Sequence, residues 1–450
     1  MKKYFLMRGS IAAAWFLAML FLCHWTATEA REPTNRQSGN SPSQPLVLSN
    51  VTIIDGRGGK PRVGQTVVIR DGRIAQIVAA RRAPLPKGAK VLDLKGHYVI
   101  PGLIDSHVHL GSNRQELEKN LQFLFDGGIT AVRDMGGDAG LYARVAPASN
   151  AGTSLLPRLH YSATFAGPSF WGDRRWKGST GDHRPGEAPW ALAITDGTDL
   201  TAALRQAKAL GVTGIKVYSD LPPRLVRRIT VEAHRQRLPV WSHPAVFPTR
   251  PADVVRAGVD VISHSALFVW EGVETLPSGF HVSPFTDFGP VGPYARIAAA
   301  SPAILRVLDE MQRRGIILDA TVSTTAPSTS PEGSAWAVRL TTAARRRGIA
   351  IAAGTDRDDA RTADGYPTLF EEMEMLVEKV GLTPLEAITA ATWNGARALR
   401  METEFGSVEP GKLADLVILR ADPTVDIRNA RQIAYVIKEG NLYRPLRATR

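Results

Sequence analysis

Between residues 103 and 353, short apolar runs alternate with longer segments of helical pattern such as Leu200–Leu210 and Pro302–Arg314. Most runs are continuously apolar, as expected for strands that are buried on both faces of a parallel sheet. The eight runs are Leu103–His109, Ile129–Asp134, Leu159–Ala163, Gly214–Tyr218, Val240–His243, Val259–His264, Ile316–Thr321 and Ile349–Ala353. Eight repeats of strand then helix predict an α/β fold of the (β/α)8 TIM-barrel type rather than an open sheet.

The segments on either side of the predicted barrel have a sequence pattern typical of short β-strands. Residues 46–102 contain short β-type runs separated by Gly-rich turns, and strand-like runs return at Leu416–Leu419 and Ala434–Lys438. Because a short isolated strand pair is unstable, we expect the last strands to join the first ones. The predicted organisation is a small β-sandwich domain, antiparallel and built from residues 46–102 and 406–450, beside a barrel of residues 103–405.

The first 30 residues have the pattern of a signal peptide. A basic start precedes the apolar stretch Ile11–Cys23, which is too short to span a bilayer comfortably, and small residues precede a cleavage site after Ala30. An uncleaved membrane anchor is the alternative. We predict export to the periplasm or the medium, a linker at residues 31–45, and no stable membrane span after removal of the signal.

The cysteine content and the net charge exclude several kinds of site and of partner. Cys23 is the only cysteine and lies in the segment expected to be removed, so a disulfide, a Cys nucleophile and a thiolate metal site are all excluded from the mature chain. The formal net charge is +12, carried by scattered arginines without a nucleic-acid-binding motif. The basic balance therefore favours an anionic small-molecule substrate or a solvated surface, and not a nucleic acid partner.

The strongest chemical signal is the pair His107 and His109 at the end of the first predicted strand. Residues two apart on a strand point to the same face, so both imidazoles aim into the barrel, where they would make half a metal site. A His-x-His pattern alone is more often structural. At the carboxyl end of a barrel strand it gains weight, because barrel active sites lie there.

Lys216 and Tyr218 lie on the fourth predicted strand, where alternation places both side chains inward. A buried ammonium is unfavourable unless it is paired or neutralised. One interpretation is a lysine that reaches solvent at a strand end. The other is a lysine converted by CO2 into a carbamate, an anionic ligand able to bridge two metals. Tyr218 either packs in the barrel or donates a hydrogen bond to a substrate carbonyl.

Three further candidate metal ligands lie at the carboxyl ends of other predicted strands. His243 ends the fifth strand, His264 ends the sixth, and Asp356 follows the eighth. Either histidine alone is more often a core or surface residue, but two at successive strand ends strengthen the metal hypothesis. A carboxylate in the place of Asp356 can bind metal and accept a proton from water.

This ordered set of four His, one Lys and one Asp resembles the amidohydrolase superfamily, in particular its imidazolonepropionase-like and prolidase-like branch. The resemblance covers nearly everything after Pro45. It includes Val99-Ile100-Pro101-Gly102 before the first histidines, Ala257-Gly258-Val259-Asp260 before His264, and the segment GSVEPGKLADLV at residues 406–417.

The resemblance implies two divalent metal ions, with zinc as the default for such ligands, and a hydroxide between them that attacks a carbonyl. In this arrangement His107, His109 and Asp356 hold the first metal, His243 and His264 hold the second, and carbamylated Lys216 bridges them. One position departs from the branch. A second histidine often follows two residues after the fifth-strand ligand, but here that residue is Ala245, so a different substrate is expected.

The preferred reaction is hydrolysis of an amide bond in a peptide-like or N-acyl amino acid substrate. A cyclic amide or a lactone remains an alternative, since the same hydroxide would attack it. Deamination of a heterocycle is disfavoured, because such enzymes tend to lack the lysine ligand and to carry a Glu where this chain has Val246 and Phe247. A non-catalytic binding protein would have lost ligands, and all six are present.

Two long loops, Ser162–Ala191 and Ala266–Ala300, are rich in aromatic residues. Loops of this length are often functional, and these predict a lid and an apolar binding wall. Packing of the loops on each other, or a homo-oligomer contact, is an equal alternative. Arg133 and His160 also lie at strand ends and are candidate substrate-binding residues. We hypothesise that Arg133 binds a substrate carboxylate, with a local ion pair to Asp134 as the alternative.

Overall fold

The computed structural model describes residues 44–79, 86–152, 154–172, 176, 178–276, 292–324, 331–357 and 361–445. The expected signal peptide and most of the expected linker lie outside these residues. Within the described part of the chain, no helix has both the length and the apolar composition that crossing a membrane requires.

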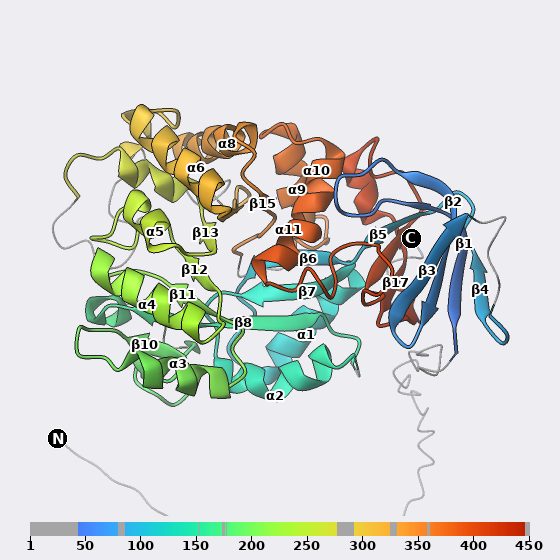
Figure 1. Cartoon of the computed structure of the whole chain (residues 1–450), viewed down its shortest axis with the longest axis horizontal. Helices are drawn as coiled ribbons and strands as arrows, with labels where there is room; N and C mark the ends of the chain where they lie inside the picture. The colour runs from blue at the N-terminus through green and yellow to red at the C-terminus, as the bar shows by residue number, and fades with distance from the viewer. Residues whose placement is uncertain are drawn as a thin grey trace, which may run out of the picture. The chain divides into compact units, whose positions relative to one another are not determined.

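The centre of the chain forms a nearly closed barrel of parallel strands with helices around it (Figure 1). Its strands are β6 (Leu103–Val108), β7 (Ile129–Asp134), β8 (Arg158–Ala166), β11 (Gly214–Val217), β12 (Val240–Ser242), β13 (Val261–Ser263), β14 (Ile317–Asp319) and β15 (Ile351–Ala352). The gap between β15 and β6 is bridged by backbone hydrogen bonds, including Ser106 N to Ala353 O at 2.9 Å and Asp356 N to His107 O at 2.8 Å. The predicted (β/α)8 barrel is confirmed.

The helices follow the expected chemistry of helix ends. They are α1 (Arg114–Asp126), α2 (Ala139–Asn150), α3 (Leu200–Ala209), α4 (Pro223–Arg235), α5 (Pro251–Ala257), α6 (Pro302–Arg314), α8 (Pro331–Arg346), α9 (Leu369–Glu378), α10 (Pro384–Ala390) and α11 (Trp393–Ala398). Proline suits the first position of several, since it lacks an N–H that would be unpaired there. At α10, Thr383 and Glu386 form a reciprocal capping box.

The two long loops are partly structured. The third barrel strand extends through Ala166, and the segment after it forms the 3-10 helix η2 (Pro168–Gly172) and the short strands β9 (Glu187–Ala188) and β10 (Ala191–Ala193). The second loop begins with η4 (Ser265–Glu271) and ends with η5 (Gly292–Ala295). Residues 277–291 of that loop lie outside the described part of the chain.

A second sheet combines both ends of the described chain, as expected. Its strands are β1 (Leu46–Ile53), β2 (Arg62–Arg70), β3 (Arg73–Ala79), β4 (Lys90–Asp93), β5 (Tyr98–Pro101), β16 (Leu416–Leu419), β17 (Ile433–Lys438) and β18 (Asn441–Tyr443). Most pairs are antiparallel, but β4 and β5 both run parallel to β1. The parallel pairs could not be predicted from the sequence, because hairpin turns reveal only the β1–β2–β3 meander, whereas β4 and β5 return to the other edge of β1.

A buried ion pair joins the barrel to this sheet. Arg158, at the start of β8, donates from Nε to Asp415 Oδ2 at 2.8 Å, and Gly102 N donates to Asp415 O at 2.8 Å. Both Arg158 and Asp415 are buried. The contact lies at the amino-terminal end of the barrel strands, opposite the carboxyl ends where barrel active sites lie.

Candidate metal centre

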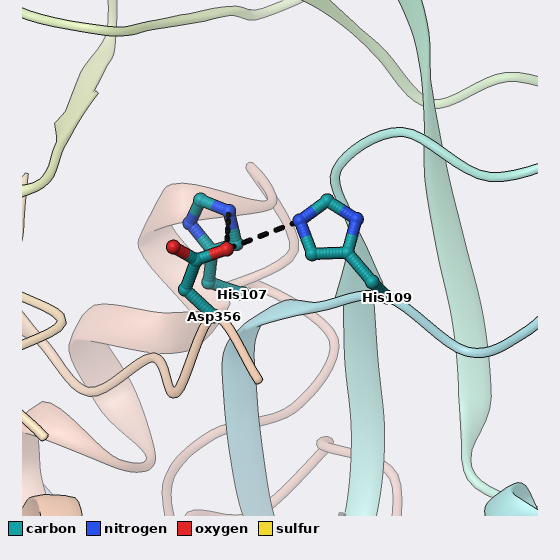
Figure 2. A group of neighbouring side chains, drawn as sticks. All are labelled: His107, His109 and Asp356. Atoms are coloured by element: carbon teal, nitrogen blue, oxygen red, sulfur yellow. Dashed lines mark hydrogen bonds and ion pairs between the residues drawn. The ribbon is translucent and has the colours of Figure 1, made fainter. Parts of the chain in front are cut away.

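Three predicted ligands lie together at the carboxyl ends of β6 and β15 (Figure 2). His107, His109 and Asp356 can each offer one ligand atom, and these atoms all lie within 4.8 Å of one another. His109 Nε2 is 3.1 Å and His107 Nε2 is 3.3 Å from Asp356 Oδ1. The parallel strands explain the convergence, since their carboxyl ends meet on one face of the barrel although a long stretch of chain separates His109 from Asp356.

The other two predicted histidines continue this cluster. The ring centroid of His264 is 4.8 Å from that of His107, and the centroid of His243 is 4.7 Å from that of His264. His264 Nδ1 is also 3.6 Å from Asp356 Oδ2. Four imidazoles and one carboxylate therefore form a continuous row across the ends of β6, β12, β13 and β15.

Lys216 lies beneath this row on β11. Its side chain is 0% exposed, and Nζ has no hydrogen-bond partner among the described residues. Burial lowers the pKa of the amine to about 7, while the charges of Asp319 and Asp356 oppose the shift. A buried amine without a hydrogen-bond partner among the described residues is rare in a protein interior, since a buried polar group is normally hydrogen-bonded.

Burial and neighbouring charges also determine the protonation states of the candidate metal ligands. Burial lowers the pKa of His264 to about 3, so its imidazole is neutral at physiological pH. Burial alone would raise the pKa of Asp356, but the neighbouring His107 and His264 hold it well below its usual range. Neutral imidazoles and an ionised carboxylate are the forms that coordinate divalent metals.

Tyr218 follows β11 and stands at the edge of the row. Its half-buried ring lies 4.2 Å from His243 and 4.5 Å from Phe170, measured between centroids. The tyrosine therefore lies between the histidine row and the aromatic residues of the first long loop. This position is compatible with both interpretations made from the sequence.

Asp319, at the end of β14, is a site residue that the sequence analysis missed. Its Oδ2 accepts hydrogen bonds from Ser263 Oγ at 2.8 Å and Arg133 Nη2 at 2.9 Å, and lies 2.8 Å from His107 Nδ1. Burial alone would raise the pKa of Asp319, but the charges of His107 and Arg133 hold it below its usual value. Such a carboxylate fixes the orientation of a metal-binding imidazole. The sequence offered one signal for this residue, since Asp319 follows the apolar residues of the seventh predicted strand.

Arg133 lies inside the barrel and not on its open face. Its side chain is 0% exposed, Nε donates to Ser106 O at 2.5 Å, and the guanidinium lies 4.9 Å from the ring centroid of Trp241. With Asp319 also bound, this arrangement favours a positioning role over the substrate contact that we hypothesised. The alternative pair with Asp134 is not formed either, because Asp134 accepts from Tyr142 and from backbone amides.

His160 is also enclosed. Neither ring nitrogen has a hydrogen-bond partner among the described residues, and the ring lies 6.1 Å from that of Phe405. Burial, and then the charge of Arg158, lowers the pKa of His160 to about 4. Its neighbours Phe405 and Arg158 are not ligands of the proposed centre.

The backbone around the cluster is tightly constrained. His264, Thr321 and Asp356 have φ angles of 67°, 46° and 49°, a left-handed conformation that is uncommon for residues other than Gly, Asn and Asp. A Cβ on Gly354 would lie 2.3 Å from Asp319 Oδ1 and 2.8 Å from the Cβ of His107. Strained residues of this kind persist where surrounding structure dictates them, and they cluster at functional sites.

Two buried acids support the strand ends. Asp105 accepts from the amides of His107 and Thr355, and burial raises its pKa to about 7. Glu372, on α9, accepts from the amides of Val322 and Ser323 just beyond β14, and burial raises its pKa to about 8. Neither residue was identified from the sequence, because nothing local marks a carboxyl that binds backbone amides of a distant strand end.

The donor set fits divalent metal ions. Imidazole nitrogens with carboxylate oxygens are the ligands that zinc and similar metals prefer. Lys216 Nζ, which no described residue partners, is a buried polar atom for which a bound group would account. Chemically, such a centre can activate water and polarise a carbonyl at the open end of the barrel.

Comparison with known proteins identifies relatives of this chain in sequence and in structure. Residues 336–443 match the amidohydrolase family. Ochratoxinase of Aspergillus niger is 26% identical over 91% of each chain, and imidazolonepropionase of Symbiobacterium thermophilum is 28% identical over 84% of this chain and 90% of the relative. A solved prolidase-like structure from Bifidobacterium longum is 26% identical, with a TM-score of 0.67 over 89% of this chain and 95% of that one.

Proposed function

Because this chain belongs to the amidohydrolase superfamily, in its imidazolonepropionase-like and prolidase-like branch, we propose that it hydrolyses an amide bond in a peptide-like or N-acyl amino acid substrate. Membership makes the chain an enzyme that acts on carbon–nitrogen bonds. The identity of the substrate is the part that we propose. The observation that carries the proposal is the convergence of His107, His109 and Asp356 at the open end of the barrel.

The proposed centre holds two divalent metals, with zinc as the first candidate. His107, His109 and Asp356 would hold one metal, His243 and His264 the second, and Lys216 as a carbamate the bridge. The full burial of Lys216 and the lack of a partner for Nζ among the described residues support this role. Burial lowers the pKa of the amine to about 7, which increases the neutral fraction that can react with CO2. Bound divalent cations lower the pKa of water and act as Lewis acids towards a carbonyl.

The side chains of the protein then have defined tasks. Asp356, held as a carboxylate, takes the proton of the attacking water and returns it to the leaving nitrogen. Tyr218, beside His243, donates a hydrogen bond to the substrate carbonyl oxygen as negative charge develops on it. Asp319 keeps His107 in one orientation through the contact at Nδ1.

A dipeptide or an N-acyl amino acid fits the surroundings of this centre. Aromatic residues of the first long loop contact Tyr218 and offer an apolar wall, and the net charge of +12 favours an anionic substrate. The names of the relatives agree, since one is an ochratoxinase and another a prolidase-like protein. Arg133 is not included as the carboxylate ligand, because its guanidinium is fully buried.

The proposal predicts metal-dependent cleavage of free acids in a library of dipeptides and N-acyl amino acids. The purified protein should contain about two metals per chain by elemental analysis, and chelation should remove activity that added Zn²⁺ restores. Matched C-terminal amides should react more slowly than the free acids. Equal rates would exclude carboxylate recognition, and turnover of lactones or cyclic amides alone would replace the proposed substrate. Full activity without metal would contradict the proposed centre itself.

We further propose that residues 1–30 direct export of the enzyme and are then removed. The basic start and the short apolar stretch support this. Sequencing of the natively expressed protein should place its first residue near Arg31, in the periplasmic or secreted fraction. An intact Met1 in the cytosolic fraction would refute the proposal.

A further inference from the structure

Trp176 is in contact with the residues that flank the proposed centre. A Cβ built on Gly136 would lie 2.9 Å from Trp176 Cη2 and 3.6 Å from His109 Cε1. The edge of the indole and the imidazole of His109 therefore both lie next to Gly136, just beyond the end of β7. On this side the indole stands beside a ligand of the first proposed metal.

The same indole also contacts Tyr218, which adjoins the second half of the proposed centre. The ring of Trp176 packs edge-on against Tyr218, with centroids 5.4 Å apart, and the ring of Tyr218 is 4.2 Å from His243. One side chain thus lies between His109 and Tyr218, which belong to opposite ends of the histidine row.

The indole is held in this position from behind. Phe170 and Trp171, on η2, lie 5.3 Å and 5.1 Å from Trp176 between ring centroids, both edge-on. Trp176 itself is only 5% exposed. Edge-on packing of several rings fixes orientation as well as position, because the edge of one ring attracts the face of the next. The indole is therefore held in a fixed orientation beside Tyr218 and His109, the two residues that flank the proposed carbonyl site.

We propose that Trp176 is the specificity-determining residue of the site and selects substrates with an aromatic ring on the acyl side of the scissile amide. This inference rests on the proposed amide hydrolysis. The acyl side is chosen because Tyr218, the residue proposed to bind the carbonyl oxygen, is in direct ring contact with Trp176. A flat aromatic group attached to that carbonyl matches an aromatic wall in shape and packs against it with specific geometry, whereas an acetyl group does not reach it.

The test compares N-benzoyl and N-acetyl derivatives of the same amino acid in three variants. Trp176→Leu should lower kcat/KM for the benzoyl substrate about tenfold or more relative to the acetyl substrate, mainly through KM, because Leu keeps apolar volume but removes the ring. Trp176→Phe should restore most of the preference. Trp190→Leu is the matched control, since Trp190 lies in the same segment but packs on His183 and donates to Ser179 O.

The outcomes separate the two proposals. An equal loss for both substrates in Trp176→Leu, with metal content retained, would overturn the specificity role, as would the same change of preference in Trp190→Leu. If the wild-type protein cleaves neither substrate, N-acyl amino acids are excluded from the proposed function. Calorimetric binding of N-benzoyl amino acid to metal-loaded wild type and Trp176→Leu then still decides the role of Trp176, because weaker binding only in the variant supports it and equal binding overturns it.

Discussion

Replacing Lys216 by Met is expected to reduce kcat by orders of magnitude and to lower the metal content of the purified protein. Lys216 is the only residue on β11 placed to bridge the proposed metals, and Met has similar volume but no atom that a carbamate could form on. The same substitution should stabilise the metal-free protein against denaturant, because it removes a buried amine that has no hydrogen-bond partner among the described residues. Steady-state kinetics, elemental analysis and urea unfolding measure the three effects.

Lys208→Met provides the control for this experiment. Lys208 is exposed on α3, donates to Gln236 O and is not among the proposed metal ligands, so its replacement should leave kcat and metal content unchanged. If Lys216→Met retained near-normal turnover and a full metal complement, Lys216 would be a structural residue, and the proposed bridge would be wrong.

Replacing Asp319 by Ala is expected to have the largest effect on stability. The substitution leaves the guanidinium of Arg133 buried without its acid, and breaking a buried ion pair from one side destabilises a protein by about 3–5 kcal/mol. It also frees Nδ1 of His107, and loss of such a partner weakens metal binding about 10–100-fold. Denaturant unfolding of the metal-free protein and metal titration give the two numbers separately.

A double variant distinguishes the two roles of Asp319. Arg133→Met combined with Asp319→Ala removes both charges, so much of the lost stability should return, while metal affinity should stay low because His107 still lacks its partner. The contrary result is an Asp319→Ala variant that unfolds at the same denaturant concentration as the wild type and binds metal with the same affinity. That result would show that Asp319 neither stabilises the barrel nor orients His107.

The sequence predicts the barrel and the meeting of its ligands for the same reason. Apolar runs mark buried strands, and in a parallel barrel the carboxyl ends of all strands lie on one face. His107, His109 and Asp356 could therefore be expected together without knowledge of any distance. The bounds of α6 were also predictable, because Pro302 begins the helix and Gly315, with a φ of 68°, ends it in the left-handed conformation.

The partners of these ligands could not be predicted. Arg133 and Asp319 come from strands on different sides of the barrel, and their contact depends on the width of the interior and on the reach of a guanidinium across it. From the sequence, Arg133 was predicted to bind substrate because it lies at a strand end. A sequence does not show in which direction such a side chain extends across the barrel. The contact of Trp176 with Gly136 and Tyr218 is similarly a property of loop geometry, which the aromatic composition of the loop does not determine.

The pairing of β5 with both β1 and β16 has a consequence for how the chain reaches its native state. Leu416 aligns with Pro101 although the whole barrel separates them in sequence, so this part of the second sheet consists of contacts of very high sequence separation. Such contacts form late, since the entropy of closing a long loop must be overcome first. Until the last strands arrive, one edge of β5 presents unpaired backbone groups, which is the kind of edge that joins strands of neighbouring chains. A newly made molecule of this enzyme is therefore most vulnerable to aggregation after its barrel strands have formed and before β16 docks.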